Sequence, residues 1–400
     1  MLKRELALQL FEAFSMQRWN DMIRPVELTE MDKHAHKMII AYCLGKYEEE
    51  GGRQVNWDTI ITGGIFELLR RIVISDIKSP IYRKIKKLHP DVFRQLNKWV
   101  YEQLKPMFEG LPKEMNTELK HYLFDTNKGD DLTKKILEAS HIYSSFWEFQ
   151  IIQKVHPSGY KIEEIERVLK NDLEPFLDLA GMRKIICKGK ILNFVDLCGQ
   201  LRFQIRWSQT PRLPKTSVLG HMLLVAIFCY LFAREVNACS KRLYNNFFSA
   251  LFHDLPEAMT RDILSPIKRS VEGMPEAISK IEEELAEKEI SPLLEEGWFD
   301  EIKYFTRNEY ESKIKIKGRV KHVTTEKINE KYNSDGYAPI DGEFIKIADD
   351  LSAYLEAYTA NDLGLNSKHL QDGRRKIEEK YKGRTIAGIS IEALFTAFAM

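Results

Sequence analysis

The sequence has few cysteines, and they form no recognisable framework. Its five cysteines include no C-x-x-C pair and no regular spacing. The sequence therefore predicts no cysteine zinc site, and we expect unpaired thiols in a reducing cytoplasm. Charge of one sign is not in excess either, because 60 Lys+Arg stand against 59 Asp+Glu. Net charge therefore indicates no particular partner.

Long apolar runs are absent as well. The longest, 222–233, is too short to cross a bilayer, and the N-terminal stretch mixes charged and apolar residues at helical spacing, unlike a signal peptide. We therefore expect a cytoplasmic protein without a membrane partner. The sequence also has no glycine-rich phosphate loop and no convincing Ser/His/Asp set, which argues against a P-loop nucleotidase and a serine hydrolase.

Strand-like alternation is scarce, whereas helical spacing of apolar residues is common. Helices are predicted over 6–14, 34–47, 93–107, 132–155, 162–179, 220–236 and 344–358. The exception is 312–322, where apolar and basic residues alternate as in a short hairpin. The predicted fold class is all-α, with one small β-hairpin-like insertion.

A long internal repeat organises the chain. Segment 64–82 aligns with 250–268 without a gap, and both contain the string D-I-x-S-P-I. Upstream, HKMIIA from His36 resembles HMLLVA from His221, and downstream 139–149 resembles 348–358. The chain is predicted to be two tandem copies of one helical unit, about 1–184 and 185–400.

The two copies differ at polar positions. Where the second has His253-Asp254, the first has a glutamate and a leucine, and where the second has Glu257 and Asp349, the first has Arg71 and Ser140. A leucine cannot bind a cation, so the first copy has lost the paired site while keeping its packing residues. This asymmetry favours a functional site in the second copy.

Two imidazoles and two carboxylates are expected to converge from three helices of the second copy: His221, His253, Asp254 and Asp349. This mixed nitrogen and oxygen set suits a divalent ion such as Mn, Co, Fe, Ni, Zn or Mg. The alternative for His221 is a core histidine satisfied by a hydrogen bond.

Two further carboxylates follow the His-Asp pair. Glu257 is one turn after His253 and within reach of a water at the metal, with a solvent-facing helix carboxylate as the alternative. Asp262 precedes Ile263-Leu264-Ser265-Pro266, so it is either a catalytic group or a structural cap. Its occurrence in both copies favours the cap.

The ordered pattern H, HD and D, with RW before the first histidine, resembles the HD superfamily of metal-dependent phosphohydrolases. The strings HDLPEAMTRD, SPIK and ADDLSAYLEA look like the bacterial branch of 5′-deoxynucleotidases, which hydrolyse deoxyribonucleoside monophosphates. The motifs cover about 201–358. The resemblance implies a tandem of HD-like domains in which the first copy is degenerate.

For the metal, the resemblance implies the ligands His221, His253, Asp254 and Asp349. For catalysis, it implies that Glu257 assists the attacking water and that Asp262 lies by the sugar or the leaving group. For the substrate, it implies three residues: Arg206 and Lys268 at the phosphate and Trp207 at the nucleoside. Retention of Arg18-Trp19 in the first copy leaves packing as an alternative for Arg206-Trp207.

Two features depart from the family pattern. Gly220 stands where an acidic residue usually precedes the first histidine, and the insertion 295–342 separates the last two ligands. The predicted function is hydrolysis of nucleotide phosphate esters, most simply 5′-(deoxy)nucleoside monophosphates. The alternatives are a phosphodiesterase or nuclease, for which the basic insertion would contact nucleic acid, and a non-catalytic nucleotide sensor. The first copy is expected to pack on the second as an intramolecular pseudo-dimer.

Overall fold

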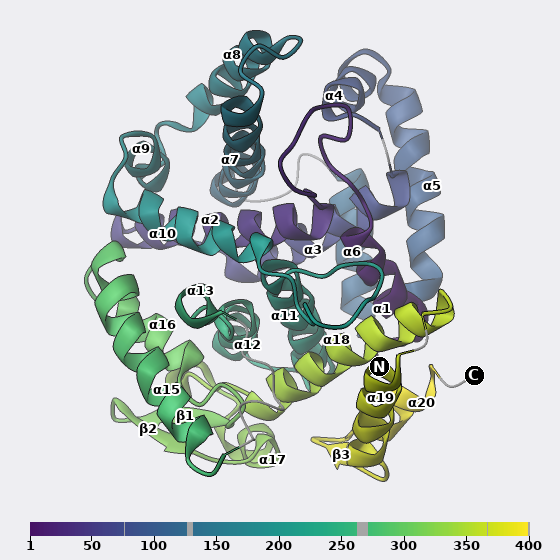
Figure 1. Cartoon of the computed structure of the whole chain (residues 1–400), viewed down its shortest axis with the longest axis vertical. Helices are drawn as coiled ribbons and strands as arrows, with labels where there is room; N and C mark the ends of the chain where they lie inside the picture. Colours follow the sequence, from purple (N-terminus) through teal and green to yellow (C-terminus); the bar gives the residue numbers. More distant parts are fainter. Residues whose placement is uncertain (76, 126–130, 262–270, 366, 399–400) are drawn as a thin grey trace.

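The computed structural model describes residues 1–75, 77–125, 131–261, 271–365 and 367–398 (Figure 1). Helices dominate, and the strands of the described residues form two small hairpins. The all-α prediction with a small hairpin in the second copy is thus confirmed. Each of the seven predicted helical segments overlaps a helix, although 162–179 extends beyond the end of its helix at Leu173 and 6–14 beyond the end of its helix at Phe11.

The long helices before residue 187 are α1 (Arg4–Phe11), α2 (Glu30–Glu50), α3 (Trp57–Ile74), α4 (Ser79–Leu88), α5 (Pro90–Phe108), α6 (Lys113–Phe124), α7 (Asp131–Val155), α8 (Ile162–Leu173) and α9 (Ala180–Ile186). Helix α2 runs through the middle of this half and packs against α7, α3 and α9 (Figure 1). The boundary predicted between residues 184 and 185 falls inside α9 and stays a prediction.

The later helices are α10 (Lys190–Gln200), α11 (Val218–Glu235), α12 (Ser240–Phe252), α13 (Glu257–Thr260), α15 (Met274–Leu285), α16 (Trp298–Thr306), α17 (Thr325–Lys327), α18 (Gly342–Asp362), α19 (Lys368–Tyr381) and α20 (Ile391–Thr396). Helix α11 packs against α12, α18 and α2, so it is the centre of this half and also its contact with the first. Short 3-10 and π turns are η1 (Glu12–Phe14), η2 (Glu174–Phe176), η3 (Leu201–Phe203), η4 (Ala286–Ile290), η5 (Ser291–Leu293), η6 (Ile328–Tyr332) and η7 (Asp335–Tyr337).

The predicted hairpin consists of β1 (Lys313–Ile316) and β2 (Arg319–His322), which pair antiparallel. Lys317 and Gly318 form its two-residue turn, with φ of 50° and 77°, a left-handed conformation that glycine adopts without strain. A second hairpin, β3 (Thr385–Ile386) with β4 (Ile389–Ser390), was not predicted. Strands of two residues are too short to show alternation in a sequence.

Helix α11 is the most buried long helix of the second copy. Every residue from Val218 to Ala233 is buried, which explains an apolar composition without a polar face. By length and composition alone, this helix also qualifies as a membrane span, as core helices of soluble proteins do, and 89% of that window is buried inside the fold. Its apolar residues therefore belong to the protein core.

Shared backbone contacts fix how the residues of the two copies correspond. An antiparallel bridge joins Gln17 to Thr29 in the first copy and Ile205 to Ser217 in the second. Thr29 is the N-cap of α2 and Ser217 is the N-cap of α11, and each side chain accepts the backbone N–H three residues later. The two long helices therefore begin at equivalent positions.

This correspondence corrects one pairing made from sequence. Four residues after the cap, Lys33 N–H donates to the carbonyl of Thr29 at 3.1 Å and His221 N–H donates to that of Ser217 at 3.0 Å. Lys33 is thus the equivalent of His221. The pairing of His36 with His221 is wrong by one helical turn, because a similar apolar string repeats three residues further on.

A close approach of the two copies explains Gly220. A Cβ atom at this position would lie 2.6 Å from Cε1 of Phe14 and 3.1 Å from Oδ1 of Asp32, both in the first copy. Asp32 also accepts a hydrogen bond from the Ser217 hydroxyl, at the N-terminus of α11. The glycine leaves the space that the first copy occupies.

A buried ion network makes the second link between the copies. Arg202 of η3 donates to Oε1 of Glu148 at 2.9 Å and lies 3.2 Å from Nδ1 of His36. The other oxygen of Glu148 accepts from Arg18 at 2.8 Å and from Trp19 at 2.9 Å. Since Ser217 and Arg202 flank the loop 204–216, the first copy holds both ends of that loop.

We expect Gly220→Ala to lower the free energy of unfolding by about 1–3 kcal/mol. The added methyl group overpacks the contact with Phe14, which outweighs the gain of up to about 1 kcal/mol in helix propensity. The measurement is chemical denaturation followed by circular dichroism. The matched control is Gly373→Ala in α19, where the nearest atom to the new Cβ is 3.6 Å away and stability should hold or rise. Equal effects of both substitutions would contradict the close approach.

Candidate metal centre

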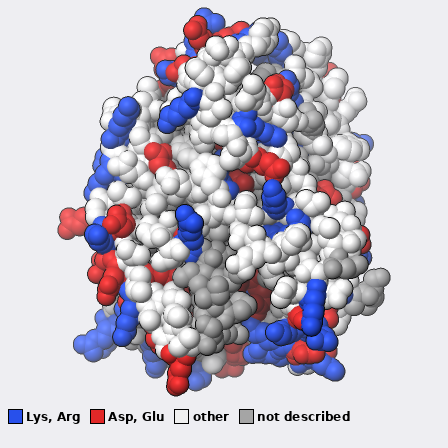
Figure 2. Space-filling model, in the orientation of Figure 1, with Lys and Arg blue, Asp and Glu red and all other residues white. Residues whose placement is uncertain are grey.

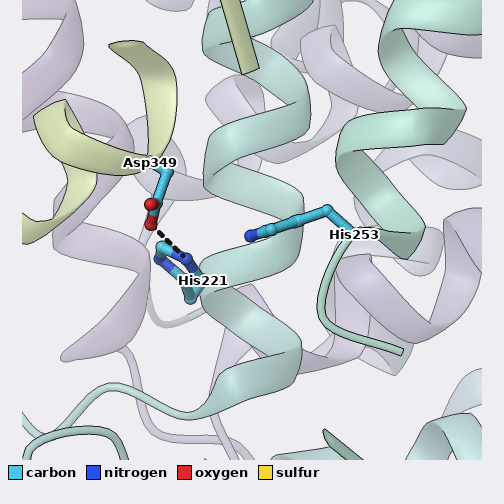
Figure 3. A group of neighbouring side chains, drawn as sticks. All are labelled: His221, His253 and Asp349. Atoms are coloured by element: carbon cyan, nitrogen blue, oxygen red, sulfur yellow. Dashed lines mark ion pairs between the residues drawn. The ribbon is translucent and has the colours of Figure 1, made fainter. Parts of the chain in front are cut away.

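His221 enters the site from the first turn of α11, where the Ser217 cap fixes the start of the helix. Its side chain is fully buried. Its Nδ1 lies 2.9 Å from the hydroxyl of Ser352 on α18, which orients the ring and leaves Nε2 directed at the carboxylate of Asp349 (Figure 3).

His253 and Asp254 follow the last residue of α12. Nδ1 of His253 donates to the carbonyl oxygen of Ala250 at 2.7 Å. Because a carbonyl oxygen can only accept, the neutral ring carries its proton on Nδ1, and Nε2 keeps a free lone pair. Such a second hydrogen bond is usual for a metal-binding histidine.

Asp349 completes the group from the first half of α18. Its Oδ1 lies 3.2 Å from Nε2 of His221, and Figure 3 shows both side chains and that of His253 directed toward one point. One ligand atom from each of these three residues lies within 4.8 Å of the others. Asp254 is also close, with Oδ2 3.2 Å from Nε2 of His253 and 3.7 Å from Nε2 of His221.

The donor set fits a divalent metal ion. Nε2 of His221 and Nε2 of His253 are buried, and neither has a hydrogen-bond partner among the described residues. Buried polar atoms without partners are costly, and a cation between the imidazoles and carboxylates would satisfy them. His221, His253 and Asp349 form a group that could hold a metal ion. Such nitrogen and oxygen donors suit Zn and neighbouring transition metals.

Electrostatics keep the carboxylates ionised. Burial and the positive charge of Arg206 lower the pKa of His221. Burial also disfavours a charged His253, but the adjacent Asp254 raises the pKa of that imidazole to about 9. Burial alone would raise the pKa of Asp254 and Asp349, yet nearby cationic groups hold both well below the usual range. The carboxylates are thus in the form that binds a cation, whereas His253 must release the proton on Nε2 before that nitrogen can bind one.

Family models match both halves of the chain. A model described as HD domain matches residues 198–378, which contain the group above. A model described as 5′-deoxynucleotidase YfbR-like matches residues 9–171. The chain is a tandem of two HD-related domains. No curated protein matches the chain.

The nucleotidase family model matches the first domain, whereas the sequence motifs predicted that likeness mainly for the second. The first domain has Leu68 in the position of Asp254. The likeness of that domain to a nucleotidase therefore rests on its scaffold and not on an intact His-Asp pair.

Arg206 and Trp207 lie at the edge of the second domain's site in different ways. The Arg206 guanidinium is 3.6 Å from Asp254 and 4.0 Å from Asp349, so it faces the proposed metal position. Trp207 instead donates its indole N–H to Glu356 at 2.6 Å and packs with a small cluster of α18 and α19 residues. Its predicted contact with a nucleoside stays a prediction.

Glu257 begins α13 and is 6% exposed. It lines a cavity together with His253, Asp254 and residues of α15 and α16, so the sequence-predicted assistant of the water lies on the same cavity wall as two ligands. Asp262 and Lys268, predicted at the leaving group and the phosphate, lie outside the described residues.

Sequence reasoning missed two residues that hold Asp349. Lys346 donates to Oδ2 of Asp349 at 2.8 Å, and the hydroxyl of Tyr310 donates to the same oxygen at 3.2 Å. The other oxygen, Oδ1, is left for the histidine side of the site. Lys346 was detectable from its spacing, three residues before Asp349 on a helix. Tyr310 comes from the insertion, and no pattern connects it to the site.

Sequence reasoning also missed a buried glutamate common to both domains. Glu148 accepts the Trp19 indole N–H at 2.9 Å, as Glu356 accepts that of Trp207. Counting back from these glutamates makes His141 the equivalent of Asp349. The sequence pairing of Ser140 with Asp349 is therefore wrong by one residue, and this slip hid the shared glutamate.

We expect Asp349→Asn and His253→Ala to lose most of the bound metal of the purified protein, because each removes one donor of the buried set. Metal content is measured by inductively coupled plasma mass spectrometry after dialysis against metal-free buffer. The control is Asp350→Asn, an adjacent carboxylate outside the donor set that bonds Lys380 and Tyr381 and pairs with Lys346 at 3.0 Å; the amide keeps an acceptor oxygen for these partners, and metal content should be unchanged. Unchanged metal content in the first two variants would defeat the assignment.

Proposed function

We propose that the second HD-related domain is a metal-dependent phosphohydrolase that removes the phosphate from 5′-(deoxy)nucleoside monophosphates. The observation that carries this proposal is the buried group of His221, His253, Asp254 and Asp349 with the Arg206 guanidinium at its edge. A cation site beside a guanidinium suits a phosphoryl group, which binds a metal ion and a bidentate arginine at once. The nucleotidase description of the first domain's family supports the monophosphate substrate.

A divalent ion bound by the four ligands would neutralise phosphoryl oxygens and make a water molecule a stronger nucleophile. The chain's own residues then position the reactants. Arg206, held at 3.3 Å by Glu356, directs its guanidinium toward Asp254 and Asp349, beside the place proposed for the phosphate. In hydrolysis, a bond forms between the water oxygen and phosphorus, and the bond from phosphorus to the sugar oxygen breaks.

Proton transfer is assigned to Glu257. As the water attacks, the Glu257 carboxylate accepts its proton, and the sugar oxygen must gain a proton as it leaves. Glu257 suits this role because it is buried and lines the same cavity as His253 and Asp254. General-base assistance of this kind contributes about 10²- to 10⁴-fold to a rate.

The surroundings of the site favour a small substrate over a polynucleotide. The cavity wall beside His253 carries the carboxylates Glu257, Glu282, Glu283, Glu287 and Glu309. Its basic residues Lys303 and Arg307 are engaged with two of these acids. A second phosphate in this direction would meet negative charge. On the described part of the face in Figure 2, basic and acidic side chains are interspersed, without a continuous basic stripe.

The hairpin has fewer basic side chains available to contact a polynucleotide than its sequence indicates. The ammonium of Lys313 donates to a backbone carbonyl, and that of Lys315 lies 4.1 Å from the centre of the Tyr304 ring. Of its basic residues, Arg319 and Lys321 lie on the exposed strand. The nuclease alternative would require cleavage of a labelled single strand, and the sensor alternative would require nucleotide binding without turnover.

We also propose that the first domain replaces the second subunit of a dimer. Helix α2 packs on α11, Ser217 bonds Asp32, and Arg202 bonds Glu148. The self-complementary surface of such a domain is then already covered within one chain. We expect light scattering after size exclusion to give a one-chain mass of about 46.8 kDa. A stable mass of two chains would contradict this role.

Metal-replete protein should release phosphate from deoxynucleoside monophosphates, measured by a colorimetric phosphate assay over a nucleotide panel. Glu257→Gln should lower kcat by about 10²- to 10⁴-fold with metal content unchanged, because the base is lost and the ligands remain. The control is Glu287→Gln, which removes a carboxylate of the same cavity wall that bonds Lys303. Equal activity of wild type and Glu257→Gln would exclude Glu257 as the base.

A further inference from the structure

The first domain has polar residues at three of the four positions that correspond to the metal ligands of the second, and the fourth is Leu68. Lys33 corresponds to His221 through the shared N-cap, and His141 corresponds to Asp349 through the shared glutamate. The ungapped match of 64–82 with 250–268 places Glu67 at His253. These correspondences rest on three independent landmarks.

The three side chains meet in space. Nζ of Lys33 lies 2.5 Å from Nδ1 of His141 and 3.9 Å from Oε1 of Glu67. Nδ1 of His141 and Oε1 of Glu67 are 2.5 Å apart. Lys37, one turn after Lys33, donates to the other oxygen of Glu67 at 2.6 Å. The side chains of both lysines are fully buried.

We propose that the Lys33 ammonium occupies the place of the metal ion in the first domain, which is therefore a metal-free site. Of the four positions proposed to bind a divalent cation in the second domain, one here carries the ammonium itself, two carry Glu67 and His141 beside it, and the fourth carries Leu68. Lys37 adds a second positive charge beside Glu67. When Lys33 is protonated, two ammonium groups thus supply the charge of one divalent ion, with no ion to be acquired or lost.

Charge balance supports this arrangement. Burial lowers the pKa of Lys33 to about 7 although Glu67 acts in the opposite direction, so the ammonium form predominates below pH 7 and the charged and neutral forms are about equal at pH 7. Glu67 has a pKa well below its usual range, because Lys37 and His141 outweigh its burial. Two buried ammonium groups without that carboxylate would be strongly destabilising.

The arginines of the first domain's site are also paired with a side chain of the protein. One oxygen of Glu30 accepts from Arg18 at 2.9 Å and from Arg71 at 2.8 Å. Arg18 corresponds to Arg206, the guanidinium expected at the phosphate. A carboxylate of the protein therefore holds the arginines where a substrate anion would lie, so the domain carries both an internal cation and an internal anion.

Metal stoichiometry tests the proposal. Proteins are dialysed with Zn²⁺ at pH 7, freed of excess ion and analysed by inductively coupled plasma mass spectrometry. Wild type should hold one ion per chain, and a variant with His253→Ala and Asp254→Asn should hold none. Lys33→His should raise the count from one to two, because an imidazole would join Glu67 and His141 as a two-nitrogen, one-carboxylate set.

The control is Lys33→Met, which removes the ammonium without adding a donor and should still hold one ion. The proposal would be overturned by two ions in wild type, or by an ion that remains when both His253 and Asp254 are replaced. Neither result depends on whether a variant of the first domain folds. A folded Lys33→His protein with an unchanged count would overturn it as well. If wild type holds no ion, the proposed function fails, and a rise from zero to one in Lys33→His still supports the Lys33 assignment.

Discussion

Each domain has a buried glutamate that accepts hydrogen bonds from an arginine and a tryptophan. The site of the second domain depends on these bonds. Glu356 accepts from Trp207 at 2.6 Å and from Arg206 at 3.3 Å, and it also accepts the hydroxyl of Thr216. Although burial opposes ionisation, Arg212 and Arg206 lower the pKa of Glu356 to about 2. An unpaired carboxylate there would cost several kcal/mol. The donors on loop 204–216 are therefore fixed to α18, the helix that also carries Asp349.

The two domains show how one helical scaffold satisfies the same electrostatic demand twice. Imidazoles and carboxylates that converge in a dry core need a cation between them. In the second domain the Nε2 atoms of His221 and His253 face carboxylate oxygens without making a hydrogen bond, which suits a dissociable ion. In the first, Lys33 satisfies its neighbours from within the chain. On this proposal, the first domain of this chain replaces the charge of the metal ion and does not simply delete it.

The sequence was sufficient for the helical class, the tandem organisation and the four residues that converge. His253, Asp254 and Asp349 stood out because the first copy lacks equivalents of the same type. The reasoning failed where similarity was judged from apolar strings: one slip of three residues paired His36 with His221, and one slip of a residue concealed Glu148 and Glu356. Apolar helices repeat similar strings every turn, so only caps and bridges fix their register.

Other contacts had no sequence signal at all. Tyr310 reaches Asp349 from an insertion, and Arg202 reaches Glu148 in the other domain; both contacts depend on how helices distant in the chain pack. The second hairpin is too short to alternate. Such features follow from tertiary packing, which a single sequence without aligned relatives does not reveal.

Gly220 and Asp32 occupy equivalent positions and touch each other across the contact between the domains. In a symmetric dimer of identical chains, one codon would specify both, so a glycine on one side would impose a glycine on the other. Fusion of two copies into one chain removes that constraint. Each half of the interface is encoded by its own codons. The two equivalent positions can therefore carry different residues that fit each other, which a symmetric homodimer cannot encode.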